Sequence, residues 1–135
     1  MKTLDMRFIR YLNLFERETR VRTKNCFEYN NIIIFAVPPQ LVSRAIGEQG
    51  RNIKKMTEIL GKKIKVISLP FRGIEEFLSR IVEPVTFKSI EISGNEIIIN
   101  AGRQSKAALI GRNKARLDEL NQIAKEYFGK EVRII

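Results

Sequence analysis

Two glycines separated by two residues form the most informative short motif in the sequence. The segment from Ile46 to Ile53 reads IGEQGRNI, and the spacing of apolar residues predicts a helix on each side of it. Glycines at positions 47 and 50 would let a nucleic-acid backbone approach the main chain without a Cβ in the way. N–H groups at the start of the following helix would then face phosphate oxygens. Taken alone, the same glycines are equally typical of a helix C-cap and a tight turn.

A related segment follows 64 residues later, where Gly111 is followed by Arg112, Asn113 and Lys114. The first glycine is kept and the second is replaced by Lys114. A Cβ at that position would stand where the backbone of a ligand comes closest, so we expect nucleic acid to lie farther out or to bind less well there. Arg112, Lys114 and Arg116 can compensate as phosphate contacts.

Both segments belong to an internal repeat. At an offset of 64, identical residues align in matching predicted elements: Asn31, Ile33, Ile34, Ile46, Gly47 and Ile59 with Asn95, Ile97, Ile98, Ile110, Gly111 and Ile123. Near the end of each copy the offset becomes 68, so the second copy has gained four residues, about one helical turn. We therefore expect two units, residues 1–70 and 71–135, with a boundary near Pro70 to Gly73.

Each unit is predicted to contain helix, strand, strand, helix, helix and strand, which is an α+β arrangement. In the first unit these are a helix with Thr3 as N-cap, strands Cys26–Tyr29 and Ile32–Val37 around the turn Asn30-Asn31, a helix from Pro38-Pro39 to Ile46, a helix with Ile53, Met56, Ile59 and Leu60 inward that ends at Gly61, and a strand Ile64–Leu69. In the second they are a short helix from Ile74 to Val82, strands Phe87–Ile92 and Ile97–Ala101 around a four-residue loop, a helix through Ala107 to Ile110, a long helix ended by Gly129, and a strand Val132–Ile135.

Positive charge is concentrated in the first half of the chain. The net charge is +10, with 25 Lys and Arg against 15 Asp and Glu, which indicates nucleic acid or an anionic surface as partner. Residues 1–70 hold 14 basic and 6 acidic side chains, whereas residues 71–135 hold 11 and 9. We expect the first unit to dominate contact with phosphate.

Other features of the composition argue against catalysis and against a membrane protein. The chain has no His, which removes the commonest general acid/base and transition-metal ligand. The single Cys26 is expected to be a buried structural thiol in a cytosolic protein. No secretion signal and no apolar stretch long enough to span a membrane is seen, so we expect a cytoplasmic location.

The first glycine segment resembles the GxxG loop of a KH domain, and the order of elements resembles the type II KH fold. Two such units resemble the short archaeal NusA-like transcription factors. The resemblance covers about residues 3 to 135 and is carried by AIGEQGRNIKK, by IGRNKARLDEL and by the G-K-x-[IV]-[KR]-[VI]-I strands that end each unit. It implies two tandem type II KH domains, each with a three-stranded sheet and helices on one face. In that family, paired KH domains bind single-stranded RNA beside the transcribing polymerase and influence pausing, elongation or termination.

The resemblance also implies where RNA would bind, with no cofactor and no metal. In the first unit the RNA-binding residues would be Arg44, Ile46, Gly47, Glu48, Gln49, Gly50, Arg51, Asn52 and Lys54. In the second they would be Gly111, Arg112, Asn113, Lys114 and Arg116. Glu48 is unfavourable beside phosphate, so we assign the loop's contact to its backbone and the positive charge to Arg44, Arg51 and Lys54. RNA polymerase is a second candidate partner.

The sequence bears on three alternative functions. A double-KH protein of the ribosome, or an RNA chaperone, would carry the same groove. A nucleotide enzyme would need a loop such as G-x-x-x-x-G-K-[ST], but Gly61-Lys62-Lys63 lacks both the upstream glycine and the hydroxyl. A recognition helix for duplex DNA is disfavoured by the glycine-rich linkage and the flanking strands.

Overall fold

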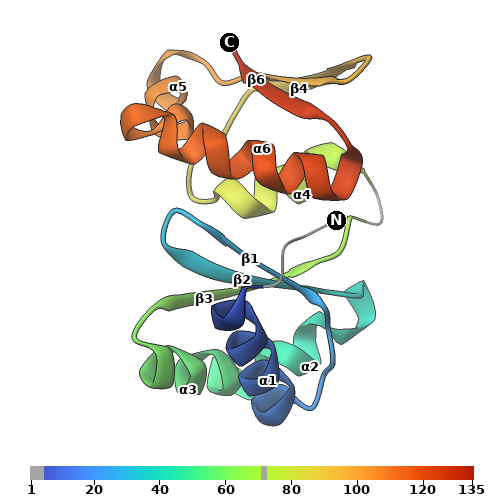
Figure 1. Cartoon of the computed structure of the whole chain (residues 1–135), viewed down its shortest axis with the longest axis vertical. Helices are drawn as coiled ribbons and strands as arrows, with labels where there is room; N and C mark the ends of the chain where they lie inside the picture. The colour runs from blue at the N-terminus through green and yellow to red at the C-terminus, as the bar shows by residue number, and fades with distance from the viewer. Residues whose placement is uncertain (1–4, 71–72) are drawn as a thin grey trace. The chain divides into compact units, whose positions relative to one another are not determined.

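The chain folds into two compact units whose boundary lies near residue 71. Figure 1 shows the computed structural model, which describes residues 5–70 and 73–135. These residues form six α-helices, three short 3-10 helices and two three-stranded sheets. Each unit has the predicted order of helix, strand, strand, helix, helix and strand, so the fold is α+β.

The first unit places three helices on one face of a mixed sheet (Figure 1). Its elements are α1 (Met6–Thr19), β1 (Asn25–Tyr29), β2 (Ile32–Val37), η1 (Pro39–Leu41), α2 (Val42–Ile46), η2 (Glu48–Gly50), α3 (Arg51–Leu60) and β3 (Lys63–Ser68). The central strand β2 pairs antiparallel with β1 and parallel with β3. Asn30 and Asn31 both have positive φ, 52° and 62°, as a two-residue hairpin turn of this hand requires.

The core of the first unit lies between this sheet and its helices. Phe15 of α1 stacks on Phe35 of β2 with ring centroids 4.3 Å apart, and both side chains are fully buried together with Cys26 and Met56. Ile59, which we expected to point inward, is 50% exposed. It is turned about 100° around the helix from its neighbour Leu60, which places it outside the stripe that faces the sheet.

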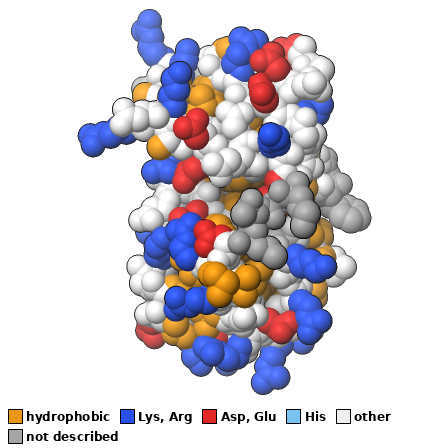
Figure 2. Space-filling model, viewed as in Figure 1, with side chains coloured by type: hydrophobic (Ala, Val, Ile, Leu, Met, Phe, Trp, Pro, Cys, Tyr) orange, Lys and Arg blue, Asp and Glu red, His pale blue; other side chains and the backbone are white. Residues whose placement is uncertain are grey.

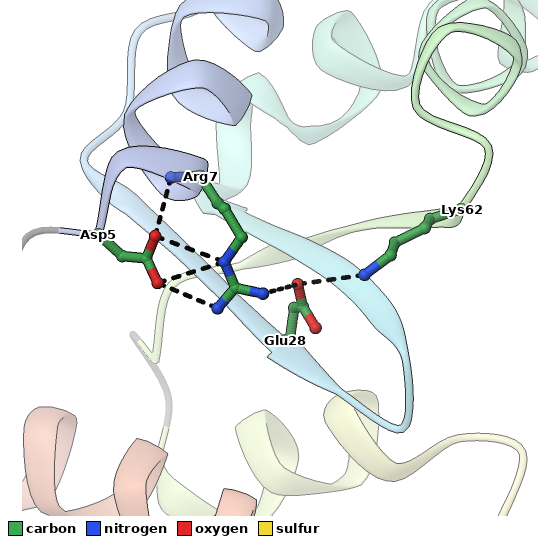
Figure 3. Close-up of polar contacts among 4 residues, drawn as sticks. All are labelled: Asp5, Arg7, Glu28 and Lys62. Atoms are coloured by element: carbon green, nitrogen blue, oxygen red, sulfur yellow. Dashed lines mark hydrogen bonds and ion pairs between the residues drawn. The ribbon is translucent and has the colours of Figure 1, made fainter.

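The first turn of α1 closes over the edge strand β1. Thr3, the expected N-cap, lies outside the described residues, and the helix begins at Met6 with Asp5 accepting a hydrogen bond from the Arg7 N–H at 2.8 Å. Figure 3 shows Arg7 between two carboxylates, its Nη2 3.0 Å from Asp5 Oδ2 and its Nη1 3.9 Å from Glu28 Oε1. Lys62 reaches the same Glu28 oxygen at 3.5 Å. The edge of the first sheet is therefore bracketed by Arg7 of α1 and by Lys62, which lies between α3 and β3.

The second unit repeats this plan with a shorter first helix (Figure 1). Its elements are α4 (Ile74–Val82), β4 (Ser89–Ser93), β5 (Glu96–Asn100), α5 (Arg103–Ile110), η3 (Arg112–Lys114), α6 (Ala115–Phe128) and β6 (Glu131–Ile134). The central strand β5 pairs antiparallel with β4 and parallel with β6. The expected four-residue hairpin loop is wrong: Ser93 pairs with Glu96, so the ladder extends until only Gly94 and Asn95 form the turn.

Aromatic and aliphatic side chains form the core of the second unit. Phe77 of α4 lies 5.1 Å from the ring of Tyr127 and 5.8 Å from that of Phe128, which ties α4 to α6. Ile97 and Ile99 of the central strand are fully buried against the helices. No helix in the described part of the chain is both long and apolar enough to cross a membrane.

Candidate nucleic-acid interface

The first glycine segment is a sharp turn between two helices. The helix α2 ends at Ile46, and the N–H of the capping residue Gly47 donates to the Ser43 carbonyl at 3.0 Å. The Gly50 N–H donates back to the Gly47 carbonyl at 3.1 Å, and α3 begins at the next residue. Gly47, Gln49 and Gly50 all have positive φ, at 82°, 56° and 73°. The segment is therefore a defined loop whose backbone conformation favours glycine at both ends.

The two glycines differ in the space that surrounds the position of a Cβ atom. A Cβ on Gly47 would lie 2.9 Å from Asn52 Nδ2, so the loop itself excludes a side chain there. A Cβ on Gly50 would meet no protein atom within 4 Å. Gly50 therefore leaves open space beside the backbone at the start of α3, which is the space that an approaching chain of another molecule would need.

Asn52 holds this loop in shape. Its Nδ2 donates to the carbonyl of Ala45 at 3.2 Å and approaches that of Arg44 at 3.4 Å, which ties the last turn of α2 to the first turn of α3. We grouped Asn52 with the RNA contacts by sequence, whereas its amide is engaged within the loop. The signal for this role is an Asn in the first turn of a helix, within reach of carbonyls that the preceding helix leaves without intrahelical partners.

Three cations that flank the first loop have no counter-ion among the described residues. Arg44 on α2 and Arg51 and Lys54 on α3 are exposed, and none of them forms an ion pair within residues 5–70 and 73–135. The neighbouring Lys55 differs, since its Nζ lies 3.1 Å from Glu18 Oε1 on α1. Hydrogen bonds from Lys55 and then Arg17 lower the pKa of the Glu18 carboxyl. Figure 2 shows further Lys and Arg side chains over the helices of this unit.

The remaining predicted residues of the first site surround the loop. Glu48 and Gln49 at its tip are exposed, while Ile46 and Ile53 on the two adjoining helices are half-buried. The cap position of α3 is Gly50, which has no side chain to accept from the N–H groups of the first turn. The structure thus brings the predicted residues to one helix–loop–helix segment, with uncapped N–H groups at its centre.

The second loop has the same backbone path. Gly111, Asn113 and Lys114 have φ values of 77°, 54° and 62°, close to those of Gly47, Gln49 and Gly50. The same two hydrogen bonds recur, from Gly111 to the Ala107 carbonyl at 2.9 Å and from Lys114 to the Gly111 carbonyl at 3.2 Å. Lys114 therefore takes a left-handed conformation that costs a residue with a Cβ about 1 kcal/mol.

The second loop carries its charge differently. Arg112 and Lys114 are exposed within the loop, but Arg116, in the position of Asn52, forms an ion pair with Glu119. The positions that match Arg44, Arg51 and Lys54 are Ala108, Ala115 and Asp118. The described residues contain no group of three or more His, Cys, Asp or Glu side chains placed to hold a metal ion.

Archaeal proteins of one kind match most of the chain, although no protein-family model matches it. A protein of Methanococcus vannielii named probable transcription termination protein NusA is 25% identical over 129 residues, which cover 92% of this chain and 74% of that protein. The chain resembles the archaeal NusA-like proteins. Proteins with the same name match from Halococcus morrhuae, at 23% identity with 93% of this chain and 92% of that one covered, and from Halobacterium salinarum, at 19% with 85% and 84% covered.

A solved structure also matches nearly the whole chain. The crystal structure of APE1850 superposes with a TM-score of 0.63 and 28% identity, covering 98% of this chain and 100% of that one. That likeness extends over both units. The resemblance to the archaeal NusA-like proteins is confirmed by the named relatives.

Proposed function

We propose that the chain is an RNA-binding transcription factor of the NusA-like kind, built from two tandem type II KH domains at residues 1–70 and 71–135. It would bind single-stranded nascent RNA and modulate elongation or termination of transcription, without a catalytic step. The observation that carries RNA binding is the open space at Gly50 beside three cations that have no counter-ion within the described residues. The names of the archaeal relatives support the role in transcription.

The first loop would bind RNA chiefly through its phosphates. A phosphate placed beside Gly50 would accept from first-turn N–H groups of α3 and lie near the positive end of the helix. Arg44, Arg51 and Lys54 would neutralise neighbouring phosphates. Bases would lie over the half-buried Ile46 and Ile53, with base edges and 2′-hydroxyls supplying discrimination.

Salt dependence tests the electrostatic part of this proposal. If about three to five phosphates are neutralised, the log–log slope of affinity against salt for a short single-stranded RNA should be roughly −2 to −4. Fluorescence anisotropy titrations over a range of KCl concentrations measure it, with single-stranded DNA and duplex as competitors. A flat response would contradict the proposed groove.

Substitution within the loop tests its position. Glu48→Asp with Gln49→Asp adds one negative charge at an exposed tip, and Asp tolerates the positive φ of Gln49, so the protein should stay folded while RNA binding weakens. Asn13→Asp on the exposed face of α1 adds the same charge elsewhere and is the matched control. Undiminished RNA affinity in the double variant would place the site away from this loop.

Capture from native cell extract separates the transcription role from a ribosomal one. RNA polymerase should be retained by the tagged protein, in part through nascent RNA and therefore less after RNase treatment. Retention of ribosomal subunits in place of polymerase would favour the alternative of a ribosome-associated protein or RNA chaperone.

A further inference from the structure

The second unit has a shallow groove between the start of α4 and the edge strand β4. Its volume is about 740 Å³. The apolar lining comes from Ile74, Ile90 and Ile92, and the polar lining from Glu75, Glu76 and Ser79. All of these residues belong to the second unit, and none belongs to either glycine loop.

The groove lies beside the start of α4, the shorter of the two matching helices. The helix α1 has 14 residues and α4 has 9, and the first residue of α4, Ile74, aligns with Arg10 at the offset of 64. Ile92 stands in the sheet where Glu28 stands in the first unit: Glu28 pairs with Ile33, Ile92 pairs with Ile97, and those two partners align in the repeat. A carboxylate bracketed by Arg7 and Lys62 (Figure 3) is thus replaced by an isoleucine that is 46% exposed.

The strand beside the groove is open for pairing. In the described residues β4 is an edge strand whose one neighbour is β5. Ile90 and Ile92 are two residues apart, so both side chains lie on the same face of the strand and line the groove. An exposed edge with an apolar face is the surface onto which a peptide adds as a further strand.

Charge selects the class of partner. Among the described residues that line the groove, the charged ones are Glu75 and Glu76, on a chain whose net charge is +10. Glu76 lies 3.6 Å from Arg80, while Glu75 has no ion pair within the described residues. Phosphate would be repelled from this rim, whereas Lys or Arg side chains would be attracted to it.

We propose that this groove, with the edge of β4, binds an extended segment of a partner protein that carries apolar side chains and Lys or Arg at every second position, and therefore on one face of the added strand. The segment would pair its backbone with β4, place its apolar side chains on Ile90 and Ile92, and direct its basic side chains to Glu75 and Glu76. The site does not depend on RNA binding by the first loop.

Selection of peptides tests the proposal before any partner has been identified. The probe is a library of random short peptides displayed on phage, selected against the full chain in RNA-free buffer. The selected peptides should carry their apolar and basic residues two positions apart, on one face of the strand, and their synthetic forms should lose about tenfold or more in affinity for the Ile92→Glu variant. Glu75→Lys with Glu76→Lys should weaken them as well.

Matched variants make the outcome decisive. Ile59→Glu makes the same change at an isoleucine of similar exposure, 50%, in the first unit, and should leave peptide affinity unchanged. Thermal unfolding confirms that each variant is folded. Peptides that bind Ile92→Glu as well as wild type, or a selection that yields no apolar and basic residues two positions apart, would overturn the proposal. Loss of RNA binding in the Glu48 and Gln49 variant should leave peptide binding intact, which separates this site from the proposed RNA site.

Discussion

The two glycine loops share a backbone and differ in where their charges lie. In the first unit the loop tip is Glu48 and Gln49, and the cations stand on the flanking helices. In the second unit Arg112 and Lys114 are in the loop itself, and the matching helix positions are alanines and Asp118. The path of the backbone has been kept through the repeat while the charge pattern has been rearranged. A shared fold is therefore no guarantee of a shared ligand.

The edge strands differ in the same way. The first sheet has Glu28 bracketed by Arg7 and Lys62, and the second has an exposed Ile92 beside an acidic rim. An edge with paired charges resists further strand pairing, whereas an apolar edge favours it. Under the proposals above, the first unit is specialised for RNA and the second for a protein partner.

Exchange of the helix charges should give the largest effect on RNA binding. Replacing Arg44→Ala, Arg51→Ala and Lys54→Asp gives the first unit the residues of the second. We expect RNA affinity to fall about a hundredfold and the salt slope to become shallower by about 2, since three phosphate contacts are lost. Anisotropy titrations at several salt concentrations measure both quantities.

The matched variant lies in the second loop. Arg112→Ala with Lys114→Ala removes two exposed cations from the other unit and should weaken RNA binding much less. An equal or larger loss there would reverse the ranking of the two units.

Filling the open space at Gly50 should have the next largest effect on RNA affinity. Gly50→Lys gives the first loop the residue of the second and places a side chain in the open space beside α3. If close approach limits binding, RNA affinity should fall about tenfold despite the added charge, because a loss of about 1.4 kcal/mol is tenfold. The left-handed conformation should also cost about 1 kcal/mol of stability, measured by urea unfolding.

Lys114→Gly is the reciprocal change. It should relieve strain in the second loop and improve RNA binding there, with a gain in stability below about 1 kcal/mol because glycine also increases the entropy of the unfolded chain. Tighter RNA binding by Gly50→Lys would show that charge, and not access, limits the first loop.

The order of elements could be predicted because its signals are local. Pro38 and Pro39 end a strand, Gly61 and Gly129 end helices in the left-handed conformation, and apolar spacing gave α4 its observed bounds. The errors arose where two local signals compete. Ser93 and Glu96 suit a loop as well as a strand, and pairing across the hairpin decided in favour of the strand.

The position of the first loop was also predictable, but the roles of several residues within it were not. Asn52 binds the carbonyls of Ala45 and Arg44 across the turn, and Arg116 pairs with Glu119. Those partners depend on the orientation of side chains after the helices have packed, which residue spacing does not specify. The groove at Ile92 likewise depends on how α4 packs beside β4, which residue spacing does not specify.

Loss of the Asn52 hydrogen bonds should have a smaller effect on RNA affinity than either change above. Asn52→Ala removes the hydrogen bonds that hold α2 to α3 and should weaken RNA binding severalfold, with about 1 kcal/mol lost from stability. Anisotropy and urea unfolding measure the two effects. Arg116→Asn is the companion variant, since it offers the second loop an Asn that can form the same hydrogen bonds. If Asn52→Ala lost stability with no change in RNA affinity, the loop's shape would not matter for binding.

Removal of the ion pair between α1 and α3 should give the smallest effect. It should change stability in a way that depends on pH only in the acidic range. In the first unit Lys55 of α3 forms an ion pair with Glu18 of α1. Glu119, which aligns with Lys55 in the repeat, forms its ion pair with Arg116 in the same helix. Hydrogen bonds from Lys55 and Arg17 lower the pKa of Glu18 in the folded protein, so the stability they contribute is fully present above the unfolded pKa of about 4.3 and is lost as the pH falls through the folded value. The melting temperature of wild type should therefore exceed that of Lys55→Met by a constant amount between about pH 5 and pH 7, and the gap should close below about pH 4.

Lys54→Met, which removes a neighbouring exposed amine that has no ion pair within the described residues, should show no such closure. A gap that persists into strong acid would mean that Lys55 stabilises the unit through packing of its aliphatic chain and not through Glu18.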